Sequence, residues 1–140
     1  MRALRIAGVL SVSLGLSACE SARDREAASL TTAVERFRQA DNAERSQRVE
    51  PVKAVACTAP EVCAAKATCL KGIEPTVKAL ALKAEVEQGL ADLKSGKVAP
   101  GSPEAAAMPK KLDDAEALLK EGKAGMERCD QALGDLRLRR

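Results

Sequence analysis

Cysteine thiols are the side chains of this protein best suited to chemistry, because the sequence has five cysteines and no histidine. Four of them are Cys57, Cys63, Cys69 and Cys129. Structural zinc sites bring cysteines in pairs separated by two to four residues, and thiol oxidoreductases use Cys-x-x-Cys, whereas five residues separate the first three cysteines here. We therefore expect no metal site, no cofactor and no catalytic residue. Disulfide bonds are the remaining use of these thiols.

The fifth cysteine, Cys19, ends an apolar segment near the N-terminus. Arg2 and Arg5 precede an apolar run over residues 6–16, as in an export signal, and the run is shorter than the roughly 20 residues that span a bilayer. The next residues, "LSAC", resemble the lipobox of a bacterial lipoprotein signal, which reads Leu, small, small, Cys. The alternative is an ordinary export signal cleaved after a small residue, which would leave Cys19 as a plain thiol.

The resemblance to lipoprotein signals implies a location for the protein. It implies cleavage before Cys19, a diacylglycerol on the sulfur, and a second acylation, typically by palmitate, on the amine. Several acyl chains hold a soluble domain stably at a membrane. Glu20 follows in place of the aspartate that, in enteric bacteria, is associated with retention in the inner membrane. The expected location is therefore the bacterial cell envelope, with the outer membrane favoured and the domain on its periplasmic face.

Charge gives no support for nucleic-acid binding. The whole chain carries a net charge of +3. Residues 1–18 contain two arginines and no acidic residue, so the net charge without them is +1. A nucleic-acid partner requires a basic surface that this balance does not supply.

The first helix is predicted over residues 20–49, which contain no glycine or proline. Apolar residues at steps of three and four form one narrow stripe along it: Ala27, Leu30, Val34 and Phe37. The stripe ends near residue 40. We expect the remainder to be a solvated helical spacer that lifts the domain off the membrane, with a protein contact surface as the alternative.

A second helix is predicted from about residue 58 to Lys94. Thr58 and Glu61 have the spacing of a capping box, and Pro60 suits a first helical turn. Pro75 predicts a kink near Glu74. Two apolar lines make a broad face for more than one neighbouring helix: Cys69, Ile73, Val77 and Leu80 on one, and Leu82, Val86, Leu90 and Leu93 on the other.

The last helix, which is predicted to start after Ser102 or after Met108, carries a heptad seam. Its residues alternate four and three positions apart: Met108, Leu112, Ala115, Leu119, Gly122, Met126, Cys129, Leu133 and Leu136. Gly122 and Ala115 would let a neighbouring backbone approach closely. We expect this seam to pack on the preceding helix of the same chain, which is tethered nearby. A homo-oligomeric coiled coil through the seam from Met108 to Leu136 is the alternative.

An antiparallel hairpin of the last two helices predicts the disulfide pairing. Cys69 and Cys129 average to position 99, inside the connection, so they face each other and this pairing is favoured. The bond would close a loop of about 60 residues and contribute about 4 kcal/mol. Cys57 then pairs with Cys63 from outside the helix, because six helical residues rise about 9 Å, beyond disulfide reach. The alternative joins Cys57 to Cys129 and Cys63 to Cys69.

These patterns together predict an all-α protein, namely a small antiparallel helical hairpin or three-helix bundle that is stapled by disulfides and packed like a coiled coil. The predicted domains are a signal peptide over 1–18, a lipid anchor and helical spacer over 19–56, and a disulfide-stapled helical domain over 57–140. Three passes along the bundle would point the basic tail "LRLRR" away from the membrane.

The expected function follows from location and architecture. We expect a membrane-anchored structural or protein-interaction module of the envelope, without catalytic activity. Its partners would be the membrane, through the lipid, and an envelope protein. The alternative is an envelope thiol-redox or metal-handling protein that uses the four cysteines other than Cys19.

Overall fold

Two long helices dominate the fold, and two shorter ones lie against part of their length. The computed structural model describes residues 21–138, so Cys19 and the predicted signal peptide lie outside it. The order is α1 (Ala22–Gln39), a 3₁₀ turn η1 (Arg45–Arg48), α2 (Val49–Lys53), α3 (Pro60–Lys94) and α4 (Pro103–Leu138). Residues 21–138 contain no strand, which confirms the all-α prediction.

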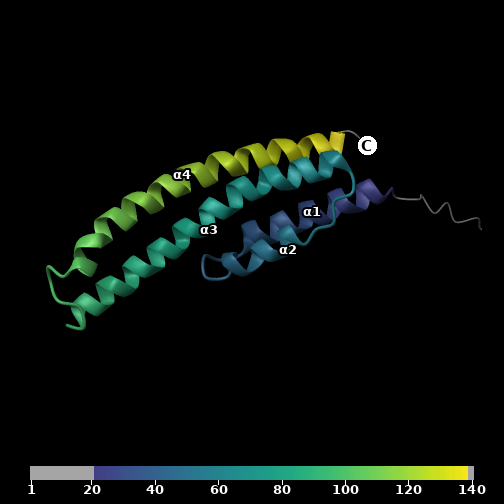
Figure 1. Cartoon of the computed structure of the whole chain (residues 1–140). Helices are drawn as coiled ribbons and strands as arrows, with labels where there is room; N and C mark the ends of the chain where they lie inside the picture. The colour runs from purple at the N-terminus through teal and green to yellow at the C-terminus, as the bar shows by residue number, and fades with distance from the viewer. Residues whose placement is uncertain (1–20, 139–140) are drawn as a thin grey trace, which may run out of the picture.

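α3 and α4 form an antiparallel hairpin that is covered over only half its length (Figure 1). α1 and α2 lie beside the half that contains the start of α3 and the end of α4. We call this half the base, with hairpin residues 60–77 and 122–138. The other half, residues 78–121, extends alone and is called the arm.

α1 forms where the sequence predicts it and ends earlier than predicted. The Ser21 hydroxyl accepts a hydrogen bond from the Asp24 amide at 3.1 Å, which caps the first turn. The predicted stripe is buried as a continuous face of the helix. After Gln39 the chain turns, and the Asp41 carboxylate accepts a hydrogen bond from the Glu44 amide at 2.9 Å. The prediction of one helix to residue 49 is therefore wrong beyond Gln39.

The segment predicted as a solvated spacer instead doubles back along α1. In α2, Val49 and Val52 are buried in the same core as α1 and α3. The core therefore crosses the predicted domain boundary between residues 56 and 57. Its members come from all four helices: Ala27, Leu30, Ala33, Val34, Phe37, Val49, Val52, Val62, Ala65, Cys69, Ile73, Cys129, Leu133 and Leu136.

The start of α3 is capped by a side chain from α1. The Glu26 carboxylate accepts hydrogen bonds from the Thr58 amide at 2.8 Å, the Thr58 hydroxyl at 2.6 Å and the Ala59 amide at 3.2 Å. Ala59 is the N-cap residue and supplies no side-chain hydrogen bond. The predicted capping box is therefore wrong, because Glu61 accepts a hydrogen bond from Arg23 of α1 instead, at 2.8 Å.

Both long helices continue through an internal proline. α3 includes Pro75, so the kink predicted near Glu74 does not end the helix. α4 includes Pro109 and begins at Pro103. The Ser102 hydroxyl accepts a hydrogen bond from the Ala105 amide at 3.2 Å, which confirms the earlier of the two predicted starts.

Glycines allow α3 and α4 to touch backbone to backbone where the base meets the arm. A Cβ atom added at Gly72 would lie 2.5 Å from the Met126 nitrogen and 2.6 Å from the Gly125 carbonyl carbon. A Cβ atom at Gly122 would lie 3.1 Å from the Thr76 nitrogen. The predicted close approach at Gly122 is thereby confirmed.

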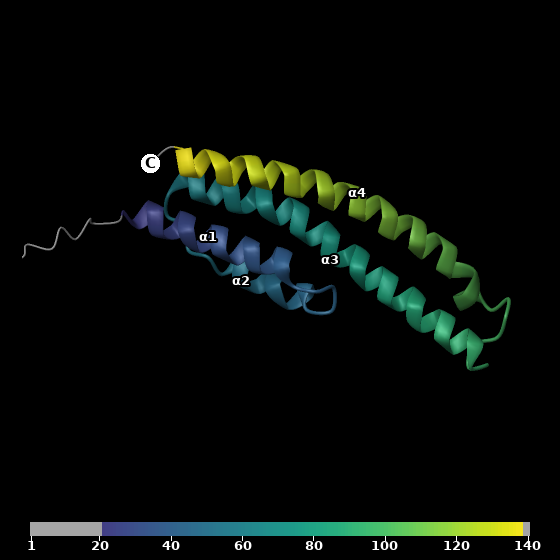
Figure 2. The same cartoon turned by 180° about the vertical axis from the view of Figure 1, so that it is seen from behind.

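The end of α4 lies beside the start of α1 (Figure 2), where Arg23 donates a hydrogen bond to the Leu136 carbonyl at 3.1 Å. The sequence predicts this end of α4 at the opposite end of the bundle, and for residues 136–138, the described part of the basic tail, this prediction is wrong. The cause is the extra pass made by residues 41–56, which gives the chain four passes along the bundle instead of three. Arg137 and Leu138 are therefore at the end nearest the predicted anchor.

Candidate functional site

The four cysteines in the described residues form the two disulfides that were favoured from the sequence. Cys69 and Cys129 are bonded with their Cα atoms 4.5 Å apart, and Cys57 and Cys63 with their Cα atoms 5.1 Å apart. Cys57 lies outside α3, which begins at Pro60, as the second pairing requires. The alternative connectivity is excluded.

The two disulfides differ in exposure and in what they join. Cys69 and Cys129 are fully buried and connect the two long helices within the core. Cys57 and Cys63 are only half-buried and close a short loop at the start of α3. Within residues 21–138, no group of three or more Cys, Asp or Glu side chains could hold a metal ion.

Ion pairs fasten α1 to the hairpin in the base. Arg23 contacts Glu61 of α3 at 2.8 Å and Asp24 of its own helix at 2.9 Å. The hydrogen bond that Arg23 donates to Glu61, with a further contribution from Asp24, raises the pKa of the Arg23 guanidinium above its ordinary value. Arg38, near the end of α1, pairs with Asp130 of α4. These contacts fix α1 at both of its ends.

The Glu26 carboxylate that caps α3 has a pKa below its ordinary value. The main cause is the Thr58 hydroxyl, followed by the Thr58 amide, and burial opposes them. Hydrogen bonds to a carboxylate favour its charged form. No sequence pattern predicts this contact, because Glu26 is 32 residues from Thr58.

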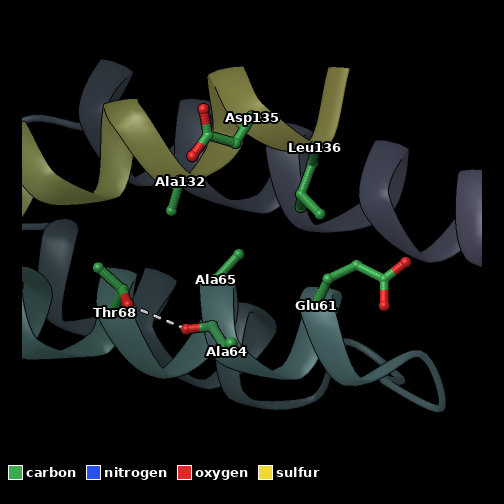
Figure 3. A pocket seen from close by; sticks show the side chains of 7 residues that line it. All are labelled: Glu61, Ala64, Ala65, Thr68, Ala132, Asp135 and Leu136. Atoms are coloured by element: carbon green, nitrogen blue, oxygen red, sulfur yellow. Dashed lines mark hydrogen bonds between the residues drawn. The ribbon is translucent and has the colours of Figure 1, made fainter. Parts of the chain in front are cut away.

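A shallow groove lies on the face of the base opposite α1, between the start of α3 and the end of α4 (Figure 3). Its volume is about 220 Å³ and three alanines form much of its lining. The carboxylates of Glu61 and Asp135 point in different directions in Figure 3, and the Thr68 hydroxyl donates to the Ala64 carbonyl at 2.9 Å. The groove therefore does not bring two carboxylates together as an acid and base pair.

The heptad seam of α4 separates into two columns with different environments. One column is buried along the whole hairpin: Met108, Ala115, Gly122, Cys129 and Leu136. In the other column Leu133 is 4% exposed, Met126 is half-buried, and Leu119 and Leu112 are 37% and 46% exposed. Packing of the seam within the chain is confirmed for the first column, and for the second column only in the base.

α3 shows the same change on the side that faces α1. Cys69 is fully buried and Thr76 is half-buried, whereas Lys83 is exposed and Leu90 is 47% exposed. These four residues are seven positions apart and so stay on one side of a helix in a coiled-coil pair. The arm therefore carries an uncovered apolar surface, which we call the arm groove and define by Leu80, Leu90, Leu112 and Leu119.

The arm groove begins where α1 ends. Phe37 of α1 and Leu119, with Thr76 and Met126, line one hollow of about 300 Å³, and its other lining residues are charged: Arg38, Arg45, Lys123 and Asp130. Asn42 and Ala43, in the turn after α1, line another of about 200 Å³ together with Leu80. The Arg45 guanidinium lies 5.9 Å from the centre of the Phe37 ring. The turn after α1 therefore lies against the start of the arm, and the exposed Leu90 and Leu112 lie beyond it.

No known protein family matches the chain, and neither a curated protein nor a solved structure resembles it. None of the helices within residues 21–138 combines the length and apolar character needed to cross a membrane.

Proposed function

We propose that this protein is a lipid-anchored lipoprotein of the bacterial cell envelope and acts as a structural or protein-interaction module, without catalytic activity. The observation that carries this proposal is the pairing of Cys57 with Cys63 and of Cys69 with Cys129. Disulfides persist in exported proteins and are rare in the bacterial cytosol. The pairing also leaves Cys19 as the one cysteine without a disulfide role, which suits a cysteine that carries lipid.

The architecture supports a presenting role. α1 begins at Ala22, three residues after Cys19, at the outer end of the base. The arm leaves the opposite end of the base, and a helix with the 35 residues of α3 is about 50 Å long. An anchor at Cys19 would therefore hold the base near the membrane and direct the arm away from it, toward the periplasm.

The surface supports binding better than catalysis. Enzyme pockets are concave and bring a few polar groups together on a ligand. The groove in Figure 3 is shallow and has three alanines among its seven lining residues, and the arm exposes Leu90, Leu112 and Leu119 as an apolar surface. Such surfaces suit contacts with another protein.

A thiol-redox role is the second candidate, and the exposure of one disulfide favours it over a metal-handling role. The Cys57–Cys63 bond is half-buried, so a dithiol reductant could reach it, whereas the Cys69–Cys129 bond lies in the core. Cys63 also lies near the start of α3, and a helix N-terminus stabilises a thiolate. This role predicts that Cys57 and Cys63 are free thiols in part of the population in cells.

Intact mass spectrometry of the protein from native membranes tests the proposal. Free thiols are alkylated without reduction in one sample and after reduction in another. The proposal predicts a mass increase from acyl chains on Cys19, no alkylation before reduction and four labels after it. Cys19→Ser is the matched control and should move the protein from the membrane pellet to the soluble fraction. Unmodified Cys19 would contradict the anchor, and labels on Cys57 and Cys63 before reduction would favour the redox role.

A further inference from the structure

We infer that the arm groove is the docking site for one amphipathic helix of another protein, seated end to end with α1. The inference deepens the proposed interaction role and rests on it. It names the kind of partner, a helix whose aliphatic residues recur three and four positions apart.

The first argument is continuity with an interface that the chain already makes. In the base, the space between α3 and α4 on this side is occupied by α1, whose Leu30 and Val34 are fully buried and whose Phe37 is nearly so. The same two columns of α3 and α4 continue into the arm in heptad spacing, with Lys83 as their one charged residue. What α1 covers at Leu133 and Cys69 is uncovered at Leu112 and Leu90.

The second argument is that the exposed apolar residues lie on one side of the arm. Four large hydrophobic residues of the described chain are exposed, and Leu90, Leu112 and Leu119 are three of them. All three fall on the α1 side by their heptad positions. The other side of the arm is bridged by an ion pair from Lys111 of α4 to Glu85 of α3 at 2.6 Å. An apolar strip confined to one side of a two-helix pair marks an interaction surface.

The third argument concerns the size of the occupant. α3 contributes residues 78–94 to the arm, about 25 Å of helix. A partner helix of about the 18 residues of α1 would fill that length. A second copy that lies along the whole of this face would meet α1 in the base, so only its arm could enter the arm groove. A single helix that begins where α1 ends meets no such obstacle. Helices that bind in a groove contact it through apolar residues at positions i, i+3, i+4 and i+7.

Site-specific photo-crosslinking of the full-length chain in its native host tests the inference. The photoreactive residue p-benzoylphenylalanine replaces Leu90, Leu112 or Leu119 in the groove. Matched controls carry it at Ala107 and Ala117, which are exposed on α4 outside the groove. Circular dichroism of each purified variant checks that helix content is unchanged. Mass spectrometry then identifies the crosslinked peptide and its sequence.

The expected result is at least a tenfold stronger crosslink to one foreign protein from the groove positions than from Ala107 and Ala117. The crosslinked peptide should be helical in sequence pattern, with aliphatic residues three and four apart. A synthetic copy of it should bind the purified chain, and Leu112→Glu with Leu119→Glu should weaken binding at least tenfold, whereas Ala117→Glu should not.

Other outcomes overturn the inference. Equal crosslinking from both sides, no crosslink from the groove, or a crosslinked product made of two copies of this chain would each remove the foreign helix as occupant. The result is separable from the anchor test. Acylated Cys19 without groove crosslinks contradicts only the docking site, and groove crosslinks with unmodified Cys19 contradict only the anchor.

Discussion

The base and the arm are two halves of the same helical hairpin, and they differ in how far other helices cover them and in how they are cross-linked. In the base, α1 and α2 cover the hairpin, ion pairs hold α1 at both ends, and both disulfides lie there. In the arm, α3 and α4 bury residues such as Ala79, Val86, Met108 and Ala115, and no helix of the described chain covers them beyond the turn after α1. The base therefore has a hydrophobic core like that of a small domain, whereas the arm is a two-helix pair with apolar residues exposed on one side.

The difference shows that the heptad pattern alone does not determine burial. The second column of the α4 seam continues with leucine into the arm at Leu119 and Leu112, although these side chains stay 37% and 46% exposed. A solvated helix face would normally be polar at such positions. The apolar residues are consistent with a partner that completes the arm as α1 completes the base.

Removing the buried disulfide should give the largest loss of stability. The double variant Cys69→Ala with Cys129→Ala opens a closed loop of 60 residues and should lower the free energy of unfolding by about 4 kcal/mol. The control, Cys57→Ala with Cys63→Ala, removes a bond between residues six positions apart and should lower the free energy of unfolding by about 2 kcal/mol. Urea unfolding followed by circular dichroism measures both. Equal losses would show that the bond between the two long helices stabilises the fold no more than the Cys57–Cys63 bond does.

Leucines in the two regions should respond differently to truncation. Leu30 is fully buried in the base, so Leu30→Ala should cost about 3 kcal/mol through lost burial and the remaining cavity. Leu112 is 46% exposed in the arm, so Leu112→Ala should change stability by no more than about 0.5 kcal/mol. The same urea titration compares them. A comparable cost at Leu112 would mean that the arm leucines already have a partner within the chain.

Two glycines of α3 sharpen the same contrast. Gly72→Ala should cost about 2 kcal/mol, because the new Cβ meets backbone atoms of α4 that cannot move aside. At Gly89, in the arm, the new Cβ meets the Met108 Cε atom at 2.5 Å, the end of a flexible side chain. Gly89→Ala should therefore be neutral or stabilising by up to about 1 kcal/mol, from helix propensity. Thermal unfolding of both variants checks the prediction, and a tolerated Gly72→Ala would contradict the backbone contact.

Low pH should destabilise the protein through protonation of Glu26, and this is the smallest of the four predicted effects on stability. The folded-state pKa of Glu26 lies below its ordinary value of 4.5, so the folded state binds its proton less readily than the unfolded state. This contribution to stability is complete above about that pH and is lost as the pH falls through the lowered pKa. Glu26→Gln should flatten the fall in urea midpoint between pH 5 and pH 3. The control Glu87→Gln, on the arm, should keep the wild-type fall, and an unchanged slope in Glu26→Gln would contradict the capping role.

Sequence reasoning predicted the hairpin, the α1 stripe and both disulfides, because heptad spacing and loop midpoints depend on regular helix geometry. It missed the turn at Asp41 and the return pass through α2. The apolar pattern in this segment is too short to predict a buried helix, because it consists of Val49 and Val52, whose burial depends on α1 and α3. That omission reversed the predicted position of the tail. The Glu26 cap and the exposure of Leu112 were also beyond reach, because both depend on which helices meet in space.

Hydrogen–deuterium exchange of the purified protein, resolved along α3, tests the contrast between base and arm most directly. Both segments belong to the same helix, so they are compared within one molecule under the same conditions. We predict that amides of residues 62–76 exchange at least a hundredfold more slowly than amides of residues 80–94, because opening the base requires unfolding the disulfide-linked core. Uniform protection along α3 would contradict the account, because it would show that the arm is as tightly closed as the base.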